Sequence, residues 1–325
     1  MNRRKSLALA AGVSLWAAGR LRKHAYTLRG RTVLITGGSR GLGLALARQM
    51  RDQGARVAIC GRDPESLKRA NESLAKTGAE VIAIQADVAD PASVTELLDE
   101  VRRRLGPVDV LINNAGVIEV GPAVTMSVAD YEAAMATNFW GMLYPTLALL
   151  PEMRARRSGR IVNITSIGGK LGLPHLLPYS ASKFAAVGFS QGLRAEVAAD
   201  GIKVVTVCPG LMRTGSSRNA IFRGRHRAEY AWFSISHALP GLSISAEAAA
   251  RRIAAACRRG NAEVLFPIPA RVAAVVNAVA PGLTASILSA VDRMLPGPDG
   301  ASDAHFPLWL SRLGNRAAKK YNQIA

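Results

Sequence analysis

A tyrosine and a lysine four residues apart, Tyr179 and Lys183, are the side chains whose types and spacing first suggest chemistry. At this separation two side chains share one face of a helix, so both can point into the same cleft. A free tyrosine titrates near pH ~10, and an adjacent ammonium group favours the phenolate and lowers that pKa. We therefore expect Tyr179 to be a general acid for a carbonyl, or a general base for an alcohol.

The residues before this pair supply a third polar group. Residues 161–165 are apolar and rich in β-branched side chains, which predicts a buried strand, and Ser166 stands where that strand should end. A hydroxyl at this place could hydrogen-bond the same substrate oxygen and hold it. A tyrosine–lysine pair on a helix and a serine in a loop are also common structural features, so the rest of the chain must decide.

Composition limits the possible classes of protein. The chain has 325 residues, 49% of them hydrophobic, which is enough for one large α/β domain or two small ones. The net charge of +19 suits nucleic acid, an anionic membrane surface or anionic small molecules. Because aromatic residues are sparse and no zinc-finger or RNA-recognition motif is present, we expect no nucleic-acid partner. The cysteines Cys60, Cys208 and Cys257 have no metal-ligand or disulfide spacing, so we expect no metal and a reducing, cytoplasmic location.

Strand-like and helix-like segments alternate along the chain. Strands are expected at residues 32–35, 56–60, 81–85, 108–112, 161–165, 204–208 and 263–266, and helices over 64–77, 91–105, 128–156 and 180–200. This alternation predicts an α/β fold, a Rossmann-type doubly wound parallel sheet of about seven strands with helices on both faces. Ligands bind beyond the carboxyl ends of such strands, where Gly37, Asn113, Ser166 and Pro209 would converge.

Two features favour a nucleotide that carries a 2′-phosphate. The glycine-rich residues 36–43 lie between a strand and a helix, where backbone N–H groups can hold a pyrophosphate. Gly61 takes the position that an acidic residue usually has in NAD sites, and Arg62 and Arg40 could bind a phosphate together. We therefore expect NADP(H) rather than NAD(H). Asp63 is the counter-argument, unless it caps the helix that starts near Pro64.

Together these residues resemble the short-chain dehydrogenase/reductase family, in the common branch with TGxxxGxG and YxxxK motifs. The motifs are TGGSRGLG (36–43), NNAG (113–116), Asn138, Ser166, YSASK (179–183) and PGLMRT (209–214), and the resemblance covers about residues 30–267. It implies that Tyr179 donates a proton to the carbonyl oxygen as hydride arrives from the nicotinamide. It also implies that Ser166 positions this oxygen, that Lys183 binds the nicotinamide ribose and lowers the tyrosine pKa, and that Asn138 holds a water behind Lys183.

The resemblance also implies a set of cofactor-binding residues. Gly37, Gly41 and Gly43 would line the pyrophosphate, Asp87 would meet the adenine, and Asn113 would support the sheet beside the cofactor. Thr214 and the turn at Pro209 would contact the carboxamide. The full expected set comprises Gly37, Ser39, Arg40, Gly41, Leu42, Gly43, Arg62, Asp87, Val88, Asn113, Ala115, Gly116, Tyr179, Lys183, Pro209, Gly210 and Thr214.

The two ends of the chain depart from the family pattern. We expect an N-terminal segment over 1–28, a catalytic domain over 29–267 and a C-terminal extension over 268–325. The apolar run 7–19 has basic flanks and is too short to span a bilayer comfortably, so it could be an interfacial anchor, a cleaved signal peptide or a packed helix. Residues 271–294 predict two short apolar helices, interrupted at Pro281, that lie on a membrane, over the substrate or in a dimer contact. A basic tail follows.

The segment 211–245 should cover the substrate and suggests its class. Its apolar and aromatic side chains (Ile221, Phe222, Tyr230, Trp232 and Phe233) suit a lipophilic carbonyl or alcohol. Its arginines (Arg213, Arg218, Arg223, Arg225 and Arg227) could bind an anionic group or form a solvated face. We expect an NADP(H)-dependent oxidoreductase that is peripherally attached to a membrane and forms a homodimer or homotetramer through helices 128–156 and 180–200. The alternatives are an NAD-dependent alcohol dehydrogenase and a non-catalytic, dinucleotide-binding scaffold or sensor.

Overall fold

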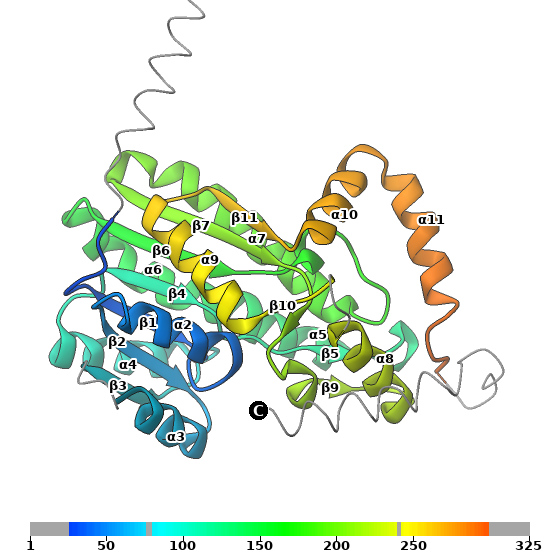
Figure 1. Cartoon of the computed structure of the whole chain (residues 1–325), viewed down its shortest axis with the longest axis horizontal. Helices are drawn as coiled ribbons and strands as arrows, with labels where there is room; N and C mark the ends of the chain where they lie inside the picture. The colour runs from blue at the N-terminus through cyan, green and yellow to red at the C-terminus, as the bar shows by residue number, and fades with distance from the viewer. Residues whose placement is uncertain (1–25, 76–79, 239–241, 299–325) are drawn as a thin grey trace, which may run out of the picture.

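A computed structural model describes residues 26–75, 80–238 and 242–298 of the chain (Figure 1). The predictions for residues 1–25 of the N-terminal segment therefore lie outside the described residues. Those for the basic tail, with Arg312, Arg316, Lys319 and Lys320, also lie outside them.

The centre of the molecule is a seven-stranded sheet with the order β11-β7-β6-β4-β1-β2-β3, and every pairing between neighbours is parallel. The strands are β1 (Thr32–Thr36), β2 (Arg56–Gly61), β3 (Val81–Gln85), β4 (Val110–Asn113), β6 (Gly159–Ile164), β7 (Ile202–Pro209) and β11 (Glu263–Phe266). The predicted doubly wound parallel sheet is confirmed. All five residues of β1 are buried, as expected for a central strand covered on both faces.

Helices cover both faces of this sheet (Figure 1). On one face the core is built by α2 (Gly41–Arg51), α3 (Pro64–Ala75) and α9 (Ala246–Arg259). On the other face it is built by α4 (Pro91–Leu105), α6 (Gly141–Ala155) and α7 (Leu177–Glu196). Side chains alternate between the two faces along β1, with Val33 and Ile35 in the first core and Leu34 in the second.

The long helix predicted over 128–156 consists of three parts. The helix α5 (Val128–Met135) passes into a five-residue π-helical turn (Ala136–Trp140), which is followed by α6. Such turns widen the backbone locally and often occur at functional sites. Asn138 lies in the π-helical turn and is buried.

Smaller elements lie beyond the carboxyl ends of the strands. Two short parallel pairs join β5 (Glu119–Val120) to β9 (Ile221–Phe222) and β8 (Met212–Arg213) to β10 (Ile244–Ser245). Between them α8 (His226–Ala238) packs Phe233 into a small apolar cluster with Val120 and Leu176. These elements cover the end of the sheet at which ligands bind.

The C-terminal extension begins with two helices that project from the β11 edge of the sheet (Figure 1). The helices α10 (Ile268–Val279) and α11 (Pro281–Asp292) are separated at Ala280, which confirms the predicted pair of short apolar helices. Within the described part of the chain, no helix combines the length and apolar character that crossing a membrane requires. The three cysteines are buried and form no disulfide.

Candidate active site

Two adjoining cavities lie at the carboxyl ends of the strands. The first, of about 650 Å³, contains the glycine turn 37–43 and is called the glycine-turn cavity below. The second, of about 180 Å³, contains Ser166, Tyr179 and Lys183 and is called the tyrosine cavity. Leu42, Gly116 and Thr214 line both cavities, so the two form one continuous site.

The glycine turn fits against the sheet too closely for larger residues. Gly37 and Gly41 have φ angles of 62° and 54°, in the left-handed region that favours glycine. A Cβ atom at Gly43 would lie 2.1 Å from the carbonyl oxygen of Gly37, and one at Gly37 would lie 2.9 Å from Ala115 Cα. The turn thus leaves an open cradle of backbone at the start of α2, and this cradle suits a pyrophosphate group.

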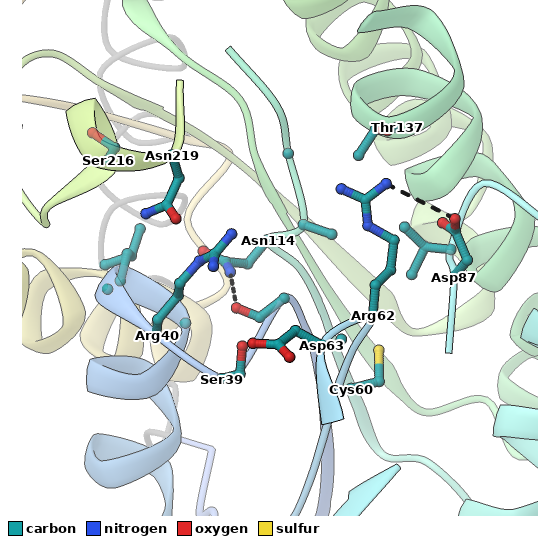
Figure 2. Close-up of a pocket in the computed structure, with 18 of the residues that line it drawn as sticks. Ser39, Arg40, Cys60, Arg62, Asp63, Asp87, Asn114, Thr137, Ser216 and Asn219 are labelled. Atoms are coloured by element: carbon teal, nitrogen blue, oxygen red, sulfur yellow. Dashed lines mark hydrogen bonds and ion pairs between the residues drawn. The ribbon is translucent and has the colours of Figure 1, made fainter. Parts of the chain in front are cut away.

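Two arginines and two carboxylates surround the far part of this cavity (Figure 2). Arg40 extends from the glycine turn, and the Nη1 atom of Arg62 lies 4.0 Å from Asp87 Oδ2. Asp63 accepts hydrogen bonds from the backbone N–H groups of Glu65 and Ser66, at the start of α3. The hydrogen bond from the Ser66 hydroxyl is the largest of the effects that lower the pKa of Asp63. Asp63 thus caps α3, as the sequence suggested.

The expected catalytic trio lines the tyrosine cavity. Ser166 lies two residues after the end of β6, and its Oγ accepts a hydrogen bond of 3.0 Å from the backbone N–H of Gly168. Tyr179 and Lys183 lie one turn apart near the start of α7. Lys183 Nζ lies 5.6 Å from the centre of the Tyr179 ring and donates to the carbonyl oxygen of Ile164 at 3.2 Å.

The pKa values in this cavity differ from the prediction. Burial raises the pKa of Tyr179 above its usual range, while the Ser166 hydroxyl acts against this effect. Burial also lowers the pKa of Lys183 to about 8. Desolvation thus dominates the pKa of the phenol, and the net shift is opposite in direction to the lowering expected from Lys183.

Asn138 joins two segments next to the site through hydrogen bonds. Its Oδ1 accepts a hydrogen bond from the Val117 backbone N–H at 2.9 Å, and its Nδ2 donates to the Val117 carbonyl and to Ser182 Oγ. A Cβ atom at Gly116 would lie 2.9 Å from Asn138 Oδ1 and 3.6 Å from Lys183 Nζ. Asn138 lines neither cavity, and it ties the segment after β4 to α7 beside Lys183.

Of the two adjacent asparagines at the end of β4, the second faces the ligand site. Asn113, predicted among the cofactor-binding residues, is buried and donates to Thr146 Oγ1 and Asn163 Oδ1. These hydrogen bonds agree with the prediction that Asn113 supports the sheet. Asn113 lines neither cavity, so the prediction that it contacts the cofactor directly does not agree with the structure. Asn114 lines both cavities, and its Nδ2 donates to the carbonyl oxygens of Thr36 and Gly37 at 3.0 Å. Its place inside the NNAG motif was the signal that could have identified it.

The other residues predicted to bind the cofactor line one or both of the two cavities. The glycine-turn cavity is lined by Gly37, Ser39, Arg40, Gly41, Leu42, Gly43, Arg62, Asp87, Val88, Ala115, Gly116 and Thr214. Pro209 and Gly210 line the tyrosine cavity together with Thr214. Sequence reasoning missed Thr137, Ser216 and Asn219 in the first cavity, because no motif marks them.

The lining of the tyrosine cavity is mostly apolar. It includes Ile118, Ile167, Leu173, Leu176, Leu211, Met212 and Phe233. Of the aromatic residues predicted to cover the substrate, Phe233 lines this cavity. The rings of Phe222 and Trp232 each pack edge to face against the Phe233 ring. None of the five arginines predicted in this segment lines either cavity. Two of them hold the structure together instead, since Arg223 pairs with Asp130 and Arg213 donates to Ser243.

Comparisons with known proteins agree with this geometry. Residues 31–221 match the family model for short chain dehydrogenase. The chain is 40% identical over 207 residues to dehydrogenase/reductase SDR family member 7B of Bos taurus, over 62% of this chain and 63% of that protein. It is 38% identical over 184 residues to the ketoacyl reductase HetN of a Nostoc species, over 57% of this chain and 64% of that protein. The matched region thus spans less than two thirds of either relative.

Solved structures show the same fold. A gluconate 5-dehydrogenase from Burkholderia cenocepacia, in complex with NADP and tartrate, has a TM-score of 0.66 at 28% identity, over 75% of this chain and 96% of that chain. A short chain dehydrogenase/reductase from Burkholderia phymatum, in complex with NAD, has a TM-score of 0.74 at 24% identity, over 79% of this chain and 96% of that chain. At this last identity the likeness concerns the fold alone.

Proposed function

We propose, from the premise that this chain belongs to the short-chain dehydrogenase/reductase family, that it is an NADP(H)-dependent oxidoreductase acting on a lipophilic ketone or aldehyde, or on the corresponding secondary alcohol. The observation that carries the proposal is that Ser166, Tyr179 and Lys183 line an apolar cavity adjoining the glycine-turn cavity. A nucleotide in one cavity and a carbonyl compound in the other would therefore meet at their junction.

The residues of this chain would divide the work as follows. When bound, the nicotinamide cofactor supplies or accepts the hydride. The Tyr179 hydroxyl donates its proton to the carbonyl oxygen, and burial keeps this hydroxyl protonated because it raises the tyrosine pKa. The Ser166 hydroxyl, which neighbours the phenol, holds the same oxygen in place. Lys183 would bind the nicotinamide ribose, and Asn138 would keep the segment after β4 against α7.

The preference for NADP(H) rests on charge at the far end of the glycine-turn cavity. Arg40 and Arg62 both line this part, and a phosphate group can accept two hydrogen bonds from one guanidinium. Asp63 also lines this part, but its carboxylate already accepts hydrogen bonds from the start of α3, which makes it less available to ribose hydroxyls. An NAD-linked alcohol dehydrogenase would instead use Asp63 to bind these ribose hydroxyls.

The proposed substrate class follows from the lining of the tyrosine cavity. Around Tyr179 the lining is mostly aliphatic or aromatic, and among the described residues Lys183 is the one charged side chain in it. A ketoacyl or other hydrophobic carbonyl compound would bury apolar surface there. A cytoplasmic homo-oligomer formed through α6 and α7 is also part of the proposal, since Leu147 and Phe184 on these helices are exposed.

Cofactor binding by the purified full chain is the first test. We expect NADPH to bind more tightly than NADH, and Arg62→Ala or Arg40→Ala to weaken NADPH binding about tenfold while changing NADH binding little. The matched control is Arg103→Ala, which removes the same charge from an exposed position on α4. A preference for NADH would replace this proposal with the NAD-linked alternative. Binding without turnover of any carbonyl compound would favour the scaffold or sensor.

A further inference from the structure

The helices α10 and α11 carry an unusual distribution of side chains for the surface of a protein. Among the described residues, fifteen large hydrophobic side chains are exposed, and seven of them lie between Ile268 and Met294. Each of the two helices buries one residue, Ala270 in α10 and Thr284 in α11. Apolar residues here face outward, the reverse of an ordinary surface helix.

The exposed residues form stripes along these helices. Ile268, Val272, Val275 and Val279 follow one another at intervals of four, three and four residues, so they share one face of α10. Leu283 and Ile287 are one turn apart on α11. The two helices contain one basic and one acidic residue, Arg271 and Asp292. We call this set of exposed side chains the helical-pair surface.

The helical-pair surface is attached to the loop that borders the tyrosine cavity. Asn277 of α10 donates a hydrogen bond of 2.9 Å to the carbonyl oxygen of Lys170. Asp292 at the end of α11 lies 3.6 Å from His175 Nε2. Between Lys170 and His175 lies Leu173, which lines the tyrosine cavity. Whatever covers this surface therefore lies close to the path by which an apolar substrate would enter.

We propose that the helical-pair surface docks on an anionic lipid surface and brings the tyrosine cavity next to it. The occupant is inferred partly from the lipophilic substrate class, so this inference rests on the proposed function. Charge points to the same occupant. The chain has a net charge of +19, and the sequence of residues 306–325 contains four basic residues and no acidic one. Apolar side chains that enter the acyl boundary beside basic segments are the usual features of interfacial binding.

A fluorescent label on the helical-pair surface tests the proposal directly. All three natural cysteines are buried, so a single introduced cysteine can be labelled with an environment-sensitive dye. We would label Val279→Cys and, as a control of equal exposure, Val128→Cys, because these valines are 76% and 74% exposed. The probe is a vesicle of phosphatidylcholine and phosphatidylglycerol in equal parts. We expect a blue shift of the dye at position 279 and none at position 128.

Substitutions provide a second, independent measurement. Val275→Glu with Ile287→Glu should lower the fraction of full-length protein that sediments with these vesicles about tenfold. Val124→Glu with Val128→Glu, at exposed apolar positions away from α6, α7 and the helical-pair surface, should leave that fraction unchanged. All four positions lie outside the two cavities, so both variants should keep their affinity for NADPH.

Three outcomes would overturn the proposal. Vesicle binding without a dye shift at position 279 would assign attachment to another part of the chain. A dye shift that depends on protein concentration and occurs without vesicles would assign the surface to a second copy. Equal shifts with pure phosphatidylcholine in high salt would exclude selection for anionic lipid. Because none of these measurements requires turnover, failure of NADPH binding would refute the proposed function alone.

Discussion

The imidazole of His175 lies against the carboxylate of Glu229, with Nδ1 2.9 and 3.0 Å from the two carboxylate oxygens. His175 belongs to the loop before α7 and Glu229 to α8, and both side chains are buried. Glu229 also accepts a hydrogen bond of 2.6 Å from Trp232 Nε1. His175 has a φ angle of 60°, unusual for a residue other than glycine, so this contact holds a strained residue in place. The loop that borders the tyrosine cavity is thereby fastened to α8.

Removing this carboxylate should loosen the cover of the tyrosine cavity. Glu229→Ala leaves the buried ring N–H of His175 and the half-buried indole N–H of Trp232 without their acceptor, which should lower the free energy of unfolding by about 2 kcal/mol or more. Urea unfolding would measure the loss. The control is Glu72→Ala, an exposed glutamate on α3, which should change stability by less than about 0.5 kcal/mol. Equal losses for the two variants would contradict a special role for the contact.

Replacing the tyrosine should separate catalysis from binding. Tyr179→Phe keeps the ring and removes the proton donor, so turnover should fall about 10²-fold or more while NADPH affinity stays nearly unchanged. Steady-state rates and a binding titration on the same preparation would show both effects. If the variant kept its turnover, another group would have to supply the proton.

The stability of the cofactor-free protein should depend on pH through Lys183. Burial lowers the pKa of Lys183 to about 8 from its usual 10.5, so the unfolded chain binds more protons between these two pH values. The contribution of Lys183 to stability therefore rises with pH in this window and is least favourable below pH about 8. Lys183→Met should be more stable than wild type by about 3 kcal/mol at pH 7, and this advantage should vanish by pH about 10.5. A constant difference across the window would refute the assignment.

Glu119 should produce a dependence of the opposite sign. This residue of β5 is 1% exposed, and neither of its carboxylate oxygens has a hydrogen-bond partner. Burial raises its pKa to about 7 from 4.5, with Asp130 adding to the shift and Arg223 opposing it. The folded state therefore holds the proton more tightly, and stability falls as pH rises from about 4.5 to about 7.

Glu119→Gln removes this titration without changing the shape of the side chain. At pH 8 the variant should be more stable than wild type by up to about 3 kcal/mol, whereas at pH 4.5 the two should be nearly equal. Urea unfolding at the two pH values would measure the difference. A greater advantage at the lower pH would show that the carboxyl group is not buried as described.

Local patterns in the sequence predicted most of the fold and the centre of the site. Strand ends, the glycine turn and the spacing of Tyr179 and Lys183 are set by residues close together in the chain, and these predictions agree with the structure. The choice between Asn113 and Asn114 was harder, since successive residues of an extended chain face opposite ways. The pKa of Tyr179 depends on burial by distant elements, and no spacing rule contains that information.

Contacts between distant segments could not be predicted. The partner of His175 lies 54 residues further along the chain, and nothing near either residue indicates the pairing. Asn138 is placed by a π-helical turn, which has no clear sequence signature. The helical pair was predicted as apolar, but its outward-facing stripes became apparent only when its packing was known.

The order of strands in the sheet also determines the order in which the two cavities can be assembled during synthesis. The central strand β1 can pair with β2 soon after both are made, since Val33 lies opposite Val57. The other edge of β1 pairs with β4, where Val33 lies opposite Val110, so this pairing forms only after β4 has been synthesised. It also closes the long loop between β1 and β4, which is slow. The residues that line the glycine-turn cavity from Gly37 to Thr137 are therefore synthesised before Ser166 and Tyr179 of the tyrosine cavity. A growing chain thus gains most of its nucleotide-facing surface before the side chains proposed to carry out proton transfer.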